Sequence, residues 1–249
     1  MEKSTSSLPS LTLVTSVSRM DVLQQRLATS PCLQRGGLPW TAYFNSSSAA
    51  AAFNQALDAT KANQNADWLI WAHQDVYLPS GWETQFQRAL DEALLLWPSL
   101  AVAGVYGVRG ADKNSVRAGH VLDRGQLLKE PTPLPCQVDS IDELLVAVRT
   151  NTDLRMDPAM GFDFYATDLV LQAQEAQMCA AVLDAFCEHW SDTPAHGVMP
   201  SSLINRVKKN ALAFEYKWEH RLPVTTPCFE IHKPGDVANF VDKISIAIP

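Results

Sequence analysis

Strand-like and helix-like hydrophobic patterns alternate along the first hundred residues, and this order restricts the fold more than any other feature. Four short apolar runs have the composition of buried strands: residues 11–17, 40–44, 68–72 and 100–106. Between these runs, apolar residues recur at the spacing of an α-helix. A strand–helix–strand order predicts a sheet with helices on both faces. We therefore expect an α/β fold with a mainly parallel central sheet.

Local signals mark where the helices in these intervals begin and end. The first helix is expected at residues 21–28, before Pro31. Ser46–Ser48 offer N-cap candidates for the second, an alanine-rich segment. Ser80–Glu83 matches the capping-box pattern and predicts the start of the third, which continues to about Trp97.

The alternation of strand-like and helix-like patterns is weaker in the second half of the chain. Residues 107–137 contain four glycines and three prolines, and we expect a long loop that could cover a site. A strand at 144–148, a helix at 168–178 and a strand at 180–185 are predicted to follow. The tail after Pro194 has mixed signals and no separate core, so a single domain is expected.

Composition excludes several classes of function. With 20 basic and 27 acidic residues the formal charge is −7, which disfavours nucleic acid as a partner because phosphate binding needs a basic surface. Five cysteines lie scattered without a C-x-x-C pair, as in reduced proteins of the cytoplasm. Neither a signal peptide nor a membrane-spanning run is recognisable. A cytoplasmic location is the resulting prediction.

Polar clusters follow two of the expected strands and precede one expected helix. His73-Gln74-Asp75 ends one strand, Glu188-His189 ends another, and Asp163 to Asp168 opens a helix. Open α/β sheets bind ligands at the carboxyl ends of their strands. Carboxylate and imidazole ligands together suit manganese or a similar divalent ion. Two other interpretations stay open: His189 as a hydrogen-bonded structural residue, and Asp168 as a carboxylate that favours the positive end of a helix.

The segment "WLIWAHQDVYLPSGW" resembles the strand and turn of a bacterial glycosyltransferase-like family related to glycosyltransferase family 2, in which "HQDV" stands in place of the D-x-D motif. Other segments resemble that family in the same order over most of residues 10–218. They are "SSSAAAAFNQALDAT", "LAVAGVYG", "VDSIDELLVAVR", "GFDFYATDLVLQAQEA", "EHWS" and "FEYKW". Two differences are visible: His73 replaces one acidic residue of the metal motif, and Glu143 stands where related transferases often have glycine.

The resemblance implies a GT-A type fold in one domain. Its nucleotide-binding half would span about 10–110, its acceptor and catalytic half about 111–220, and a tail 221–249. It further implies transfer of a sugar, with inversion, from a nucleotide-diphosphate donor to the hydroxyl of a saccharide, lipid-linked glycan or protein.

Site residues follow from the same resemblance. Asp168 would be the general base, which removes the proton of the acceptor hydroxyl. Asp75 and His189 would hold a divalent cation, Mn²⁺ or Mg²⁺, which acts as a Lewis acid on the departing diphosphate. The residues expected to bind the nucleotide sugar are Ser16, Asn54, His73, Asp75 and Asp142.

Two other functions remain possible at this point. One is a non-catalytic module of the same fold that binds nucleotide sugars. The other is a metal-dependent hydrolase that uses His73, Asp75 and His189 around a water molecule, although no H-x-H or H-E-x-x-H signature is present. The donor sugar, the nucleobase and the acceptor are not specified by these residues.

Overall fold

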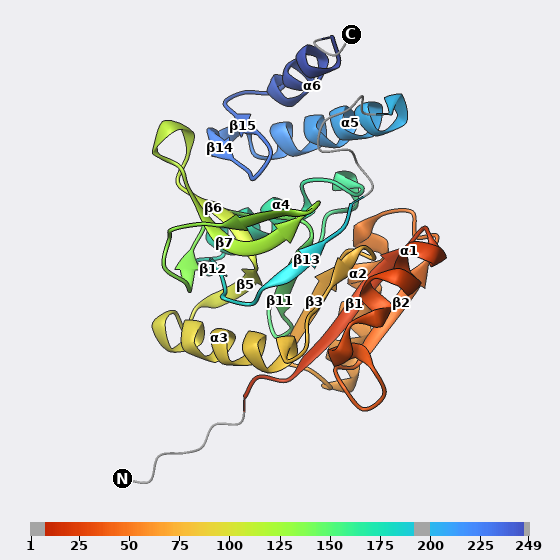
Figure 1. Cartoon of the computed structure of the whole chain (residues 1–249). Coiled ribbons are helices and arrows are strands. Elements are labelled where there is room, and N and C mark those ends of the chain that lie inside the picture. The colour runs from red at the N-terminus through yellow and green to blue at the C-terminus, as the bar shows by residue number, and fades with distance from the viewer. Residues whose placement is uncertain (1–7, 192–199, 247–249) are drawn as a thin grey trace.

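The computed structural model describes residues 8–191 and 200–246. Six α-helices occur in the described residues: α1 (Met20–Gln25), α2 (Ala49–Asn63), α3 (Trp82–Leu96), α4 (Tyr165–Glu175), α5 (Ser201–Lys217) and α6 (Asp236–Ile246). None of these helices has the length and hydrophobicity that a bilayer crossing needs. In Figure 1, helices flank the central sheet, and α5 and α6 lie together at one end of the molecule.

The central sheet has seven strands in the order β2-β1-β3-β11-β5-β12-β9. Their bounds are β1 Leu11–Val17, β2 Trp40–Phe44, β3 Trp68–Ala72, β5 Leu100–Gly104, β9 Cys136–Gln137, β11 Leu145–Arg149 and β12 Cys179–Val182. The predicted strands are thus present, but the sheet is mixed, with three parallel and three antiparallel pairings. The expectation of a mainly parallel sheet is wrong because β11 inserts between β3 and β5 and runs against both.

Strand β3 shows why the central strands are apolar throughout. Trp68, Ile70 and Ala72 pack in the core on the side of α1 and α3. Leu69 and Trp71 face the other core, which α2, α4 and α5 cover. Both faces of the strand are therefore buried, as a continuous apolar run predicts.

A second sheet occupies residues that were expected to form a loop. Its path is β10-β6-β7-β13-β4, and β8 pairs with β7. The bounds are β4 Val76–Tyr77, β6 Tyr106–Arg109, β7 Val116–Asp123, β8 Gln126–Lys129, β10 Ser140–Ile141 and β13 Cys187–His189. The loop prediction for 107–137 is wrong, since strands occupy most of this segment. Its glycines do not mark a loop: they lie within strands or in the short turns between them. Gly107 lets β6 approach β10 closely, since a Cβ atom there would lie 2.3 Å from the carbonyl oxygen of Ser140.

Two helix starts show where the predicted N-cap forms and where it does not. Ser48 caps α2 as predicted, because its Oγ accepts a hydrogen bond from the Ala51 N–H at 3.1 Å. The capping box at Ser80 does not form: Gly81, with φ of 79°, is the N-cap of α3 and no side chain caps it. Only glycine adopts that left-handed conformation without strain, so the backbone turn decides this helix start.

The C-terminal segment packs on the rest of the molecule. Phe214 of α5, Trp218 directly after this helix and Ile231 of β15 (Glu230–Ile231) belong to the same core as Val14 of β1. β15 pairs with β14 (Val224–Thr225), and α6 follows. Glu215 of α5, itself buried, accepts the backbone N–H groups of Gly235 and Val237 at the start of α6. The tail therefore shares the core of the rest of the chain.

Candidate active site at the end of β3

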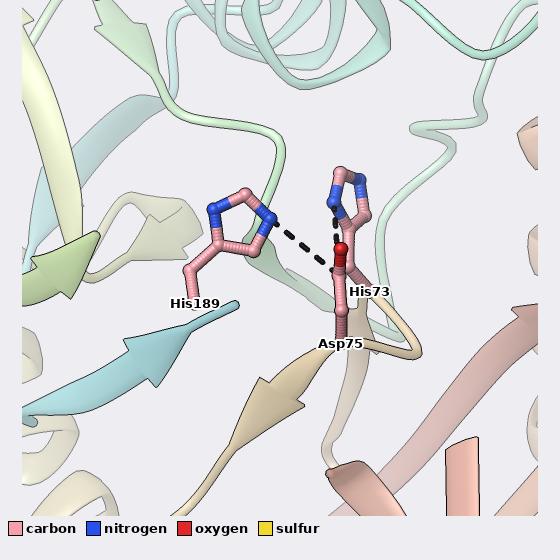
Figure 2. Close-up of side chains that lie close together, drawn as sticks. All are labelled: His73, Asp75 and His189. Carbon is pink, nitrogen blue, oxygen red and sulfur yellow. Dashed lines mark ion pairs between the residues drawn. The ribbon is translucent and has the colours of Figure 1, made fainter. Parts of the chain in front are cut away.

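Three side chains that are distant in the sequence converge where β3 ends. His73 and Asp75 lie in the turn between β3 and β4, and His189 ends β13 (Figure 2). Strand β13 pairs with β4, with His189 opposite Val76, and this pairing brings the second histidine to the turn. Oδ1 of Asp75 lies 3.5 Å from Nε2 of His189 and 3.9 Å from Nδ1 of His73. One ligand atom from each residue lies within 4.8 Å of the others, a spacing that suits one metal ion.

Hydrogen bonds fix which nitrogen of His73 faces the cluster. The hydroxyl of Tyr165 accepts from Nε1 of Trp71 at 2.9 Å and donates its one proton to the carbonyl of Glu143 at 3.0 Å. Nε2 of His73, 2.7 Å from the same hydroxyl, must therefore be the protonated nitrogen and donate. Burial lowers the pKa of His73 against the opposing effect of Asp75, which keeps the ring neutral. Nδ1 consequently carries a lone pair directed at Asp75.

His189 is oriented by a carboxylate on its far side. Oδ1 of Asp123, the last residue of β7, lies 2.8 Å from Nδ1 of His189. Burial alone would lower the pKa of His189, but hydrogen bonds with Asp123 and Asp75 raise it to about 10. Nδ1–H thus points at Asp123, and Nε2 points into the cluster. Metal-bound histidines commonly donate their second N–H to such a carboxylate.

Asp75 completes a donor set of two imidazoles and one carboxylate. Burial opposes its ionisation, yet the hydrogen bond from His189 and the positive charge of that ring bring its pKa down to about 2. The carboxylate is therefore ionised at neutral pH and available as a ligand. Mixed nitrogen and oxygen donors fit Mn²⁺ better than Mg²⁺, which prefers oxygen alone. The chemistry of the three residues fits a divalent cation.

Two hollows meet at this cluster. The first has a volume of about 310 Å³ and lies at the carboxyl ends of β1, β2 and β3. We call it the donor hollow and the second the acceptor hollow, after the roles that we propose for them below. The lining of the donor hollow is mostly polar: Ser16, Ser18, Asn45, Ser46, His73, Gln74, Asp75 and Arg206 take part. The second, the acceptor hollow, has about 380 Å³ between β7, the start of α4 and the β14–β15 turn. His73 lines both hollows, so the cluster stands at their junction.

The predicted site residues divide into two groups. Ser16, His73 and Asp75 line the donor hollow, while Asp142 and His189 line the acceptor hollow. Asn54 lines neither: its side chain bonds the backbone carbonyl and N–H of Met156 and so ties α2 to the segment before α4. The structure thus gives Asn54 a role within the fold and does not bring it to Ser16, His73 and Asp75.

Asp168 also lies outside both hollows. Its side chain is fully buried and accepts from Nε1 of Trp218 at 2.8 Å and Nε2 of Gln172 at 2.6 Å. Nζ of Lys217 is 2.7 Å from its Oδ1. The structure does not bring Asp168 together with Asp75 and His189, because position 168 is on the face of α4 that packs against the end of α5. A carboxylate enclosed in this way has no path to an acceptor hydroxyl.

Sequence reasoning did not identify several residues that the structure places at the site. Asp123 and Tyr165 hold the two histidines. Asp123 lies in a segment without a motif, and Tyr165 lies in the segment "GFDFYATDLVLQAQEA" but was given no role. Arg206 belongs to a basic cluster, Arg206-Val207-Lys208-Lys209, for which the sequence allows either phosphate binding or a solvated helix face. It lines the donor hollow and forms a bidentate pair with Asp163 through Nε and Nη2, both at 3.0 Å. Lys208 of the same cluster pairs instead with Asp242 on α6.

No family model and no curated protein sequence matches this chain. Among solved structures, the mannosyltransferase PcManGT from Pyrobaculum calidifontis, in complex with GDP-Man and Mn²⁺, is similar over 96% of this chain and 70% of its own, with 10% identity and a TM-score of 0.50. A197 from STIV aligns over 74% and 86% of the two chains at 13% identity, with a TM-score of 0.47. GalNAc-T7 with UDP, GalNAc and Mn²⁺ aligns over 84% and 50% at 10% identity, with a TM-score of 0.45. At such identity the likeness to the mannosyltransferase shows the fold alone.

Proposed function

We propose that this protein is a glycosyltransferase that moves a sugar from a nucleotide-diphosphate donor to an acceptor hydroxyl, with inversion and with the help of a divalent cation. The observation that carries the proposal is the position of the His73–Asp75–His189 cluster at the junction of the two hollows. A transferase must bring two substrates together at one reacting centre, and it needs a group there that stabilises the leaving diphosphate.

The donor hollow has the features that a nucleotide would need. It lies at the carboxyl edge of three parallel strands, where α/β sheets bind nucleotides. Hydroxyl and amide groups of Ser16, Asn45 and Ser46 offer hydrogen bonds, and Arg206 offers positive charge for phosphate oxygens. The chain shares its fold with a mannosyltransferase bound to GDP-Man and Mn²⁺, and this likeness is consistent with a nucleotide site in the donor hollow.

The cation would be held by His73 through Nδ1, by His189 through Nε2 and by one oxygen of Asp75. Bound there, it would supply Lewis-acid stabilisation to the negative charge that develops on the diphosphate. Asp123 and Tyr165 would fix the orientation of the two imidazoles. Of Mn²⁺ and Mg²⁺, manganese is our first candidate because two of the three donors are nitrogen, and magnesium prefers oxygen.

Calorimetric titration with UDP and GDP, in Mn²⁺ and in EDTA, tests the proposal. We expect at least one nucleotide to bind more tightly with Mn²⁺, and Asp75→Asn to weaken both metal and nucleotide binding. Thermal unfolding should report the same binding, since a ligand at 100 times its Kd stabilises the native state by about 2.7 kcal/mol. Equal affinity in Mn²⁺ and EDTA would remove the metal from the mechanism. Turnover of a nucleotide sugar separates a transferase from a binding module of the same fold.

A further inference from the structure

With Asp168 enclosed, the general base of the proposed reaction must be another residue. Four carboxylates line the acceptor hollow: Asp123, Asp142, Glu143 and Asp163. Two of them are engaged by other side chains: Asp123 holds His189, and Asp163 accepts from Arg206 and Asn210. The other two accept backbone N–H groups, Asp142 from Leu144 at 3.0 Å and Glu143 from Phe164. Within the described residues, only Glu143 of these two has a backbone that is bonded to the residues around His73.

The backbone of Glu143 is tied to the metal cluster. Its carbonyl accepts the Tyr165 hydroxyl, the same hydroxyl to which Nε2 of His73 donates. The next carbonyl, that of Leu144, accepts the backbone N–H of His73 at 3.0 Å. Two hydrogen bonds thus fix residues 143–144 beside His73, the residue that lines both hollows. The half-buried Glu143 side chain lines the acceptor hollow, as His73 does.

The surroundings of Glu143 also suit proton transfer. Burial and the nearby carboxylates of Asp163 and Asp142 raise its pKa well above the usual value of a glutamate, and the backbone N–H of Phe164 and the charge of Arg206 offset this only in part. A carboxylate with a raised pKa is a stronger base than an exposed one, and general bases work best when their pKa approaches the working pH.

We propose that Glu143 is the catalytic carboxylate that accepts the proton of the acceptor hydroxyl. The inference rests on the proposed glycosyl transfer. The hydroxyl oxygen forms a bond to the anomeric carbon of the nucleotide-diphosphate sugar, and the bond from that carbon to the diphosphate oxygen breaks. The electron pair of the broken bond stays on the diphosphate, and the hydroxyl proton moves to the Glu143 carboxylate. Water can take the place of the acceptor, in which case the products are the free sugar and the nucleoside diphosphate.

Glu143→Gln tests the assignment, because the amide keeps the shape of the side chain but cannot accept the proton. The substrates are a panel of UDP-, GDP- and dTDP-sugars, with water as the acceptor. The measured quantity is the rate at which nucleoside diphosphate is released. We expect the rate to fall about 100- to 10,000-fold. The Kd values for nucleoside diphosphate and for Mn²⁺ should stay within about threefold of wild type. Glu143→Asp, which keeps a carboxylate, should recover part of the rate.

Glu175→Gln is the matched control, since Glu175 is an exposed residue of α4 that pairs with His220 away from both hollows. It should turn over at the wild-type rate. A Glu143→Gln enzyme that is folded by circular dichroism and as fast as wild type would overturn the role of Glu143 and leave the proposed function standing. A wild-type protein that binds Mn²⁺ and nucleotide but turns over no donor would overturn both this role and transfer. Failure to bind either ligand would overturn the proposed function at its first step.

Discussion

Asp75 and Asp168 show at the scale of single residues how surroundings determine what a carboxylate can do. Both are largely removed from water. Asp75 faces two imidazoles and a hollow, which favours its ionised form and leaves it free to bind a cation. Asp168 is closed in by Lys217, Trp218 and Gln172, and burial raises its pKa although these partners act in the opposite direction. The first arrangement suits ligand binding and the second suits the attachment of α5 to α4.

We predict that Asp168→Ala destabilises the protein by about 2–4 kcal/mol, because it leaves a buried indole N–H and a partly buried ammonium group without their acceptor. Asp58→Ala is the control: it removes the exposed partner of Arg155, and surface ion pairs contribute at most about 1 kcal/mol. Urea unfolding of the two variants measures both values. The affinity of the Asp168 variant for Mn²⁺ should match that of wild type. Selective loss of metal binding in this variant would mean that Asp168 acts at the site after all.

At the scale of elements, β7 makes the largest contribution that the sequence did not predict. This strand pairs with β6, β8 and β13, and in the last pairing Asp123 lies opposite His189. The register places the Asp123 carboxylate beside the imidazole that ends the neighbouring strand. One pairing therefore builds the second sheet and orients a proposed metal ligand.

Asp123→Asn should weaken Mn²⁺ binding about 10- to 100-fold, the usual effect of removing a residue that orients a metal-bound histidine. The amide could still bond Nδ1, but it does not carry the negative charge that makes the imidazole a stronger ligand. Titration of bound Mn²⁺ by electron paramagnetic resonance measures the change. Asp184→Asn, an exposed substitution in the loop between β12 and β13, should leave the affinity unchanged. Equal affinities in the two variants would exclude a positioning role for Asp123.

At the scale of the whole molecule, the described residues share packed surfaces from β1 to α6. The core between the central sheet and helices α2, α4 and α5 includes Val14 near one end of the chain and Val241 near the other. A boundary near residue 110, between the nucleotide-binding and acceptor halves, would cut the central sheet, because β11 and β12 pair with β5. A single cooperative unit is therefore our prediction for this chain.

We therefore predict one unfolding transition in urea. Tryptophan fluorescence and far-ultraviolet circular dichroism should give superimposable curves, because loss of either half exposes the core that both halves share. Two separated transitions, or different midpoints for the two signals, would show that the halves fold independently.

The sequence by itself determined the central elements and part of the site. Apolar runs located β3 and β5, since a strand buried on both faces needs apolar residues at every position. β1 and the partly exposed edge strand β2 were also located from their sequence pattern. Polar residues that follow such runs led to His73, Asp75 and His189, which the structure brings together. These signals are local, and they depend on neither strand pairing nor helix packing.

Tertiary structure decided the rest. The insertion of β11 between β3 and β5 depends on contacts between residues about 75 positions apart, such as Trp71 and Val146, which no local pattern encodes. The accessibility of the carboxylates is also not encoded in any local pattern. Asp168 and Glu143 look alike in the sequence as acidic residues near expected elements, but packing against α5 encloses the first, and the turn after β10 leaves the second in the wall of a hollow. Whether a carboxylate reaches a substrate is determined by which surface covers it, and only the folded chain decides that.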